Sequence, residues 1–248
     1  MAVMSGRILA GTTHRIMLQL RHDRRTVGLL LVVPSLFLTL LYYMFDADGM
    51  VFQRVGLVML GLFPHVMMFL ITSIVMLRER QSGTLERLFT TPLGKLDLLF
   101  GYGVAFSIVA ALQGTITALV AHYLLDLDPA GHLGLVIVVA VANAVLGVAL
   151  GLLCSAFART EFQAVQFMPV VVLPQTLLCG LFVPRDDMAG WLQAISDVLP
   201  MSYAVDALLE IGGHADPTTT MWRDLAIIGG AAVLALILGA ATLRRRTP

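Results

Sequence analysis

Hydrophobic positions in this chain gather into six runs that contain no Asp, Glu, Lys or Arg. The runs are Val27–Phe45, Val55–Leu77, Leu98–Leu125, Pro129–Ala158, Phe162–Pro184 and Leu225–Leu243, each of at least 19 residues. About 20 helical residues cross the ~30 Å hydrocarbon layer of a bilayer. The pattern therefore predicts an all-α membrane protein with six spanning helices, at 27–45, 55–77, 98–125, 133–158, 162–184 and 225–243.

The polar segment before the first run, residues 1–26, has the pattern of an amphipathic helix. Basic side chains recur at intervals of seven and apolar ones fall on the opposite side of a 3.6-residue helix: Arg7, His14 and Arg21 against Leu9, Ile16 and Leu20. Two interpretations stay open. The helix is a topogenic anchor in the headgroup layer, or an elbow that also contacts a cytoplasmic partner.

The loop between the second and third runs is the most informative segment. Leu85, Leu88 and Phe89 recur at helical spacing among charged residues, between Gly83 and Pro92. An apolar edge on a short loop helix needs a cover of headgroups or of another protein. The loop is therefore a candidate docking element.

Residues 185–224 predict two short helices before the last run. One apolar stripe lies within 188–199 and stops at Pro200, and a second covers 203–211. The segment also has five carboxylates, which forbid deep burial without partners: Asp186, Asp187, Asp197, Asp206 and Glu210. We expect an outer re-entrant segment that dips into the leaflet and returns.

The placement of Lys and Arg orients the six predicted spans. Of 16 such residues, 13 fall in the segments 1–26, 78–97, 159–161 and 244–248. Short positively charged loops resist translocation. We therefore expect both termini to be cytoplasmic. We also expect residues 1–248, in which no repeat or linker is visible, to form a single domain in the plasma (inner) membrane.

Composition excludes several classes of protein. With 58% hydrophobic residues, 13% charged residues and zero net charge, the chain is neither a water-soluble globule nor a nucleic-acid binder. Its two cysteines and scattered histidines form no disulfide framework, metal-ligand spacing or catalytic set. A P-loop is also absent, because the one lysine stands in Gly94-Lys95-Leu96. We expect no catalytic residue, cofactor or metal in this chain.

Polar groups inside the runs divide into packing and pathway candidates. Asn143, Gly147, Gly151 and Ser155 recur every four residues and predict a helix-packing ridge. The second and fifth runs combine prolines with polar, aromatic and Met side chains, which suits an adaptable pathway for hydrophobic cargo. The candidates for substrate contact are Met68, Phe69, Thr72, Ser73, Gln163, Gln166, Phe167 and Gln175.

Two motifs, together with the six-span order, resemble the permease of type-2 ATP-binding-cassette (ABC) exporters. That family includes bacterial antibiotic, lipid and polysaccharide exporters. The first motif is Glu79, Arg80, Gly83, Thr84, Leu85, Glu86, Leu88 and Thr91-Pro92. The second is Gly180-Leu181-Phe182-Val183-Pro184 with Trp191-Leu192, Leu199-Pro200, Tyr203 and Ala207-Leu208.

The resemblance implies a permease that pairs with a second copy or a relative and with two ABC ATPase subunits, which bind ATP and Mg. It implies that 78–97 is a coupling loop whose docking residues are Arg80, Gly83, Thr84, Leu85, Glu86, Arg87, Leu88, Phe89, Thr91 and Pro92. It implies an outer gate at Phe182, Pro184, Trp191, Pro200 and Tyr203. Arg80 and Gln81 depart from the acidic residue that many relatives have there.

Two functions stay open at this point. The first is export of an amphipathic, drug-like or lipid-like molecule, driven by ATP that a separate subunit hydrolyses. The second is a non-transporting membrane scaffold or sensor, which recruits a cytoplasmic partner through residues 78–97.

Overall fold

The computed structural model describes residues 6–45, 49–82 and 95–242, and every regular element within these ranges is a helix. The all-α prediction is confirmed for these ranges. The elements are α1 (Gly6–His22), α2 (Arg24–Met44), α3 (Gly49–Gln81), α5 (Lys95–Leu124), α6 (Leu133–Ser155), α7 (Glu161–Leu178), the 3-10 turn η1 (Arg185–Asp187), α8 (Gly190–Ser196), α9 (Pro200–Gly213) and α10 (Thr219–Thr242).

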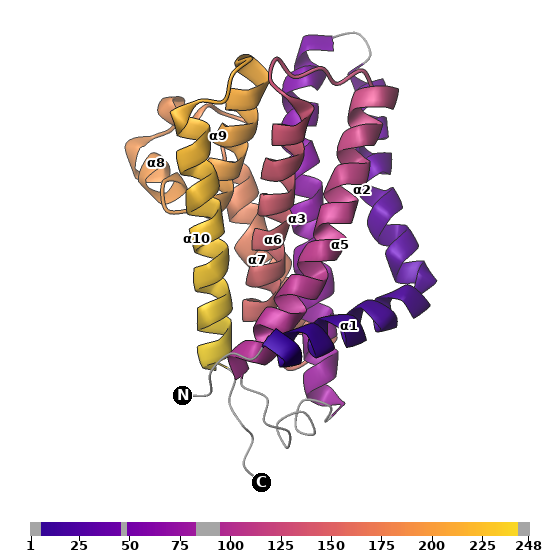
Figure 1. Cartoon of the computed structure of the whole chain (residues 1–248). Helices are drawn as coiled ribbons and strands as arrows, with labels where there is room; N and C mark the ends of the chain where they lie inside the picture. Colours follow the sequence, from indigo (N-terminus) through magenta and orange to yellow (C-terminus); the bar gives the residue numbers. More distant parts are fainter. Residues whose placement is uncertain (1–5, 46–48, 83–94, 243–248) are drawn as a thin grey trace.

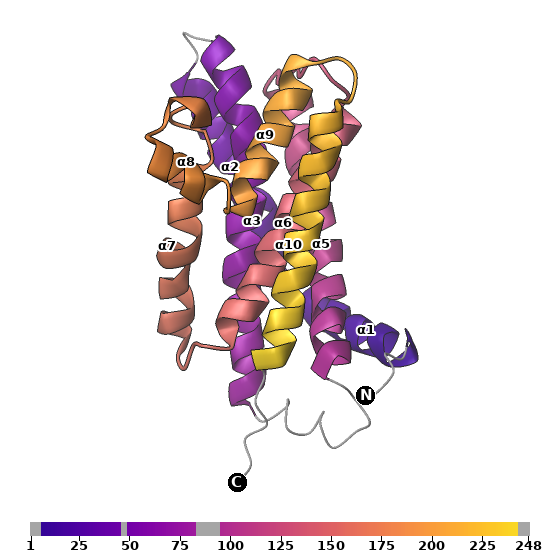
Figure 2. The same ribbon diagram turned by 90° about the vertical axis from the view of Figure 1, so that its left-hand side faces the viewer.

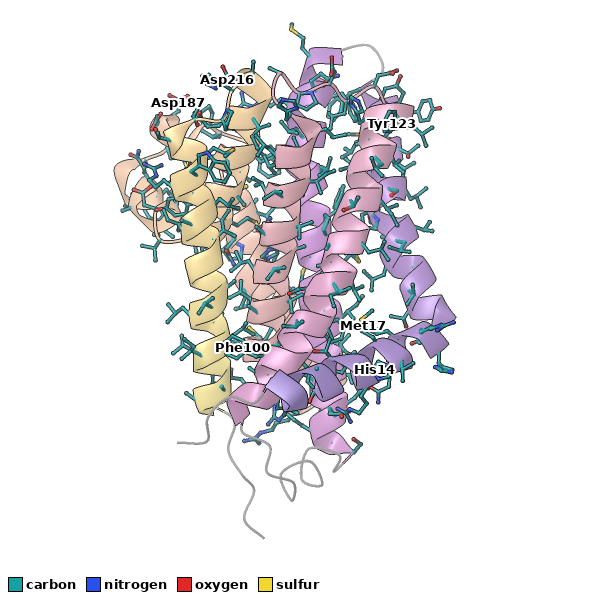
Figure 3. All side chains as sticks on the ribbon, in the orientation of Figure 1. His14, Met17, Phe100, Tyr123, Asp187 and Asp216 are labelled. Carbon is teal, nitrogen blue, oxygen red and sulfur yellow. The ribbon has the colours of Figure 1, made fainter. Side chains whose placement is uncertain are left out.

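The long helices stand side by side in a bundle, and α1 lies across one end of it (Figure 1). Within the bundle α6 contacts α3, α5 and α10, while α7 packs mainly on α3. Figure 2 shows α7 at one side, with α8 beyond its upper end. His14 and Phe100 mark what we call the α1 end, and Tyr123, Asp187 and Asp216 mark the opposite, α8 end (Figure 3).

Within the described ranges, five helices are long and apolar enough to cross a membrane: α2, α3, α5, α6 and α10. The remaining predicted span is a helix as well, but the 18 residues of α7 are not apolar enough to meet that measure. Its glutamines and the prolines Pro169 and Pro174 reduce its hydropathy. Five spans are thus supported by length and composition, and a sixth at α7 stays a prediction.

Two predicted helices begin too late in the sequence at the α8 end. The helix over 55–77 begins instead at Gly49, and Gln53 binds the neighbouring loop: its Nε2 donates to the Asp126 carbonyl at 2.7 Å, and its Oε1 accepts from the Asp128 N–H at 2.9 Å. The last span begins at Thr219, not 225. Thr218 Oγ1 accepts from the Met221 N–H at 3.1 Å and so caps this earlier start.

Two other boundaries are corrected around the outer segment. The helix predicted to reach Pro184 ends at Leu178, because Gly180 adopts a φ of 91°, a left-handed conformation that stops a helix. The second short helix begins at Pro200 and not at Tyr203. Proline has no N–H and a fixed φ, which suits the first position of a helix.

The predicted small-residue ridge of α6 packs against α3, as expected. A Cβ added at Gly147 would overlap the backbone oxygen of His65, so only glycine allows this approach. His65 is fully buried, and its Nδ1 lies 2.8 Å from the Asn143 carbonyl oxygen. In turn, Asn143 Nδ2 donates to the Gly61 carbonyl at 3.1 Å. We call this contact the α3–α6 seam.

Candidate functional site

Most of the predicted coupling residues lie outside the described part of the chain. Arg80 is described, in the last turn of α3. The others are Gly83, Thr84, Leu85, Glu86, Arg87, Leu88, Phe89, Thr91 and Pro92. The structure does describe the last turn of α3, residues 78–81, from which the chain continues into this segment. We refer to these four residues as the coupling base.

One side of the coupling base is joined to α1 and α5. The Arg15 and Glu79 side chains form an ion pair at 2.8 Å, 31% and 13% exposed. Arg15 Nη2 also donates to the Tyr102 hydroxyl at 2.8 Å, and Tyr102 is only 1% exposed. Because a partly buried ion pair is less screened than a surface pair, this contact holds α1 against the end of α3.

The apolar face of α1 strengthens the same contact. Ile16 and Leu20 are buried in the core that includes residues of α5, whereas Leu18 is exposed. Thr13 Oγ1 donates to the Gly101 carbonyl at 3.3 Å. The predicted amphipathic helix therefore lies with its apolar side against protein.

The other side of the coupling base is joined to α6 and α7. Arg78 makes two bonds to the Glu161 carboxylate, at 2.7 and 3.0 Å, and Arg80 donates to the Ser155 carbonyl. Gln81 Nε2 donates to the Arg159 carbonyl at 2.8 Å. The coupling base is therefore bonded to the first turn of α7 as well as to α1.

Four predicted substrate-contact residues on α3 are buried inside this chain. Met68, Phe69, Thr72 and Ser73 are each 0% exposed. Thr72 Oγ1 lies 2.7 Å from the Met68 carbonyl and 3.3 Å from the Val148 carbonyl of α6. In this conformation the four residues belong to helix packing, and a substrate would reach them only after the helices separate.

The four predicted substrate-contact residues on α7 differ from one another in burial. Gln175 is buried, and its Nε2 donates to the Val171 carbonyl at 2.9 Å. Gln163 and Gln166 are exposed, and Phe167 is half-buried. These last three line one groove of about 310 Å³ at the α1 end.

The predicted outer gate is organised by an arginine. Arg185 forms ion pairs with Asp197 and Asp206, which joins η1 to α8 and α9. Its guanidinium lies 5.4 Å from the Tyr203 ring centre, and the Tyr203 hydroxyl donates to the Asp197 carbonyl at 2.6 Å. Of the other gate residues, Phe182, Pro184 and Trp191 are exposed and Pro200 begins α9.

Asp197 and Asp206 therefore have the partner that the sequence pattern required. Burial acts to lower the pKa of Arg185, but Asp206 and Asp197 outweigh it and raise that pKa above its ordinary value. Burial also raises the pKa of Asp206, in spite of the opposing Arg185 charge. A cavity of about 480 Å³ adjoins the three charged groups.

Sequence reasoning missed Arg15, Tyr102, Arg159 and Arg185 as site residues. Arg15 and Tyr102 stand 87 positions apart, and no local pattern pairs them. Arg185 had a signal, since it is the one basic residue among the carboxylates of 185–210. In the described ranges, no group of three or more His, Cys, Asp or Glu side chains is placed to hold a metal ion.

Comparison with known proteins assigns the chain to a family. The model of the ABC-2 type transporter family matches residues 10–211, so the chain belongs to that family. It is therefore a multi-pass membrane protein of the ABC permease class, whose membrane subunits are not themselves catalytic.

Several curated proteins are similar to part of the chain. The probable multidrug ABC transporter permease YbhR of Escherichia coli K12 is 29% identical over 167 residues, 67% of this chain and 45% of YbhR. The linearmycin resistance permease protein LnrN of Bacillus subtilis 168 is 26% identical over 168 residues, 68% of this chain and 43% of LnrN. ABC transporter G family member 20 of Dictyostelium discoideum is 29% identical over 160 residues, 64% of this chain and 22% of that protein. The chain thus spans less than half the length of these relatives.

Proposed function

We propose that this chain is the membrane subunit of an ATP-driven exporter. It moves an amphipathic, drug-like or lipid-like molecule outward across the plasma membrane, with both termini cytoplasmic. Separate ABC ATPase subunits bind ATP and Mg and dock on residues 78–97. Family membership and the resemblance to multidrug and linearmycin-resistance permeases support this function.

The observation that supports it most is the coupling base. Four consecutive residues that lead into the predicted docking segment are bonded to α1, α6 and α7, and through Arg15 to Tyr102 of α5. A loop that only set topology would need none of these bonds. The arrangement suits the conversion of a push on residues 78–97 into movement of several helices at once.

We further propose that the functional unit is a dimer whose partner copy covers the outer face of α7. That face exposes Val170, Leu173 and Leu177 beside Gln163 and Gln166. Amides at membrane depth are costly against lipid and gain partners against protein. The α7 faces of the two copies would then enclose the pathway, with residues 184–212 as its outer valve.

Charge reversal in the docking segment tests this function. The chain is co-purified with its ABC ATPase and reconstituted in liposomes, and ATP hydrolysis is measured. We expect Glu86→Lys to insert normally and to lower transport-linked hydrolysis at least about tenfold, because like charges at an interface cost several kcal/mol. Asp216→Lys is the matched control at the α8 end and should leave hydrolysis unchanged.

Two results would contradict the proposal. One is unchanged hydrolysis across several substitutions in residues 83–92. The other is a bound ATPase that never responds to cargo and moves none, which would favour the scaffold instead.

A further inference from the structure

The α6–α7 connection and the first half of α7 form a groove at the α1 end of the bundle. It holds about 310 Å³, and three of its six lining residues are polar and three are apolar. The lining residues are Phe157, Arg159, Gln163, Gln166, Phe167 and Val170. Every polar side chain of the lining is exposed.

Among the described residues that line this groove, the only charge is positive. Its lining contains Arg159 and no carboxylate. The nearest carboxylate in sequence, Glu161, is bonded twice to Arg78. The backbone of Arg159 is used, since its N–H donates to Gln163 Oε1 at 2.8 Å and its carbonyl accepts from Gln81. Across the described ranges no ion pair involves its guanidinium.

The apolar half of the groove faces outward. Phe157 is 61% exposed and Val170 is 67% exposed, beside the half-buried Phe167. From Gln163 to Val170 the helix rises by about 10 Å, so the apolar wall extends away from Arg159 toward the middle of the bundle. An occupant that fits both halves has an anionic head and a hydrocarbon tail.

We propose that this groove binds an anionic amphiphile. Its carboxylate or phosphate pairs with Arg159 and accepts from the amides of Gln163 and Gln166, and its chain lies along Phe167 and Val170. A guanidinium next to amide donors recognises such heads through charge-assisted hydrogen bonds. The inference rests on the proposed export function, for which it names the class of cargo.

Direct binding tests the proposal without transport or ATP. The full chain in dodecyl maltoside micelles is titrated with NBD-labelled stearate and with an NBD-labelled stearyl-trimethylammonium of matched chain, and fluorescence gives each Kd. We expect the anionic probe to bind at least about tenfold more tightly than the cationic one. Equal binding of the two probes would overturn the proposal.

Variants locate the binding in the groove. Arg159→Gln should weaken stearate binding about tenfold, and Arg159→Lys should restore most of it. Gln166→Glu adds a carboxylate to the lining and should shift preference toward the cationic probe. Arg21→Gln, an exposed arginine of α1 outside the lining, is the control and should change nothing. An unchanged Kd in both Arg159→Gln and Gln166→Glu would show that the probe binds elsewhere.

Two further measurements identify the source of the amphiphile and distinguish a failure of this inference from a failure of the proposed function. In nanodiscs, displacement of stearate by phosphatidylglycerol but not by phosphatidylcholine identifies a bilayer lipid as the occupant. Retention of stearate in both identifies a single-chain amphiphile. Charge-selective binding that stays intact while reconstituted transport is absent would contradict the export function alone. Transport that does not change in Arg159→Gln would contradict this inference alone.

Discussion

Helices α6 and α7 are neighbours in sequence and are held very differently. Of the 23 residues in α6, 13 are buried, and small residues bring its backbone against α3. Of the 18 residues in α7, only Ala164, Val172 and Gln175 are buried. The comparison shows a bundle with one closely packed pair of helices and one helix attached at its margin.

The attachments of α7 add to this contrast. Near its first turn Glu161 is bonded to Arg78, and at its last residue the Leu178 carbonyl accepts from Ser196 Oγ at 2.7 Å. A helix that is anchored at both ends and lightly packed between them can shift without breaking a core. Under the proposed function, α3 and α6 would then transmit a displacement while α7 responds to it.

The largest expected loss of stability comes from a substitution that forces the α3–α6 seam apart. Gly147→Ala places a methyl group against the backbone of His65, which cannot move without shifting α3. We expect a loss of about 3 kcal/mol of unfolding free energy, at the upper end of overpacking costs. Thermal unfolding in detergent, followed by circular dichroism, measures it.

The matched control for that variant lies on α10. A Cβ at Gly229 meets no atom within 4 Å, so Gly229→Ala should be neutral or stabilise by up to about 1 kcal/mol. Equal unfolding temperatures for the two variants would mean that the seam is not tightly closed.

A second variant removes the side-chain hydrogen bonds of Asn143 in the seam and keeps a side chain of similar size. Asn143→Leu leaves the Gly61 carbonyl without this donor and removes one acceptor from His65. The expected cost is about 2 kcal/mol, typical of a buried polar group that loses its partner. On α7, Gln166→Leu should cost less than about 0.5 kcal/mol, because that side chain is exposed. Similar costs for the two substitutions would remove the distinction between the helices.

The coupling base provides a third test with a smaller effect on stability. Glu79→Gln removes the charge that holds Arg15, which is partly exposed, and should cost about 1 kcal/mol. It should also reduce ATPase stimulation in the reconstituted complex, and exchanging the two charges in Arg15→Glu with Glu79→Arg should recover part of that stimulation. Full stimulation in the single variant would mean that α1 takes no part in coupling.

The smallest expected effect on stability is on the exposed face of α7. Leu173→Ala should change the unfolding free energy of the monomer by less than about 0.5 kcal/mol. If the partner copy covers this face, the same substitution should weaken dimer formation, which analytical ultracentrifugation in detergent can follow. A large loss of monomer stability would show that α7 belongs to the core.

Much of the architecture could be predicted because each helix has its own hydropathy signal. Within the described ranges the apolar runs located α2, α3, α5, α6, α7 and α10, and the spacing of Arg7, His14 and Arg21 located α1. Boundaries were less well predicted, since α3 and α10 start earlier through bonds that Gln53 and Thr218 make with their surroundings. The candidate site was predicted mainly as segments, and its ion pairs were not predicted at all.

The sequence by itself determined that a bilayer is this chain's solvent, that its elements are helical, and that small residues on α6 serve packing. These properties depend on length, composition and spacing within one segment. Only the tertiary structure decided that Arg15 meets Glu79, that Arg185 joins two carboxylates, and that Thr72 is sealed against α6 while Gln166 stays open. Such pairings depend on which helices lie side by side, and no single segment contains that information.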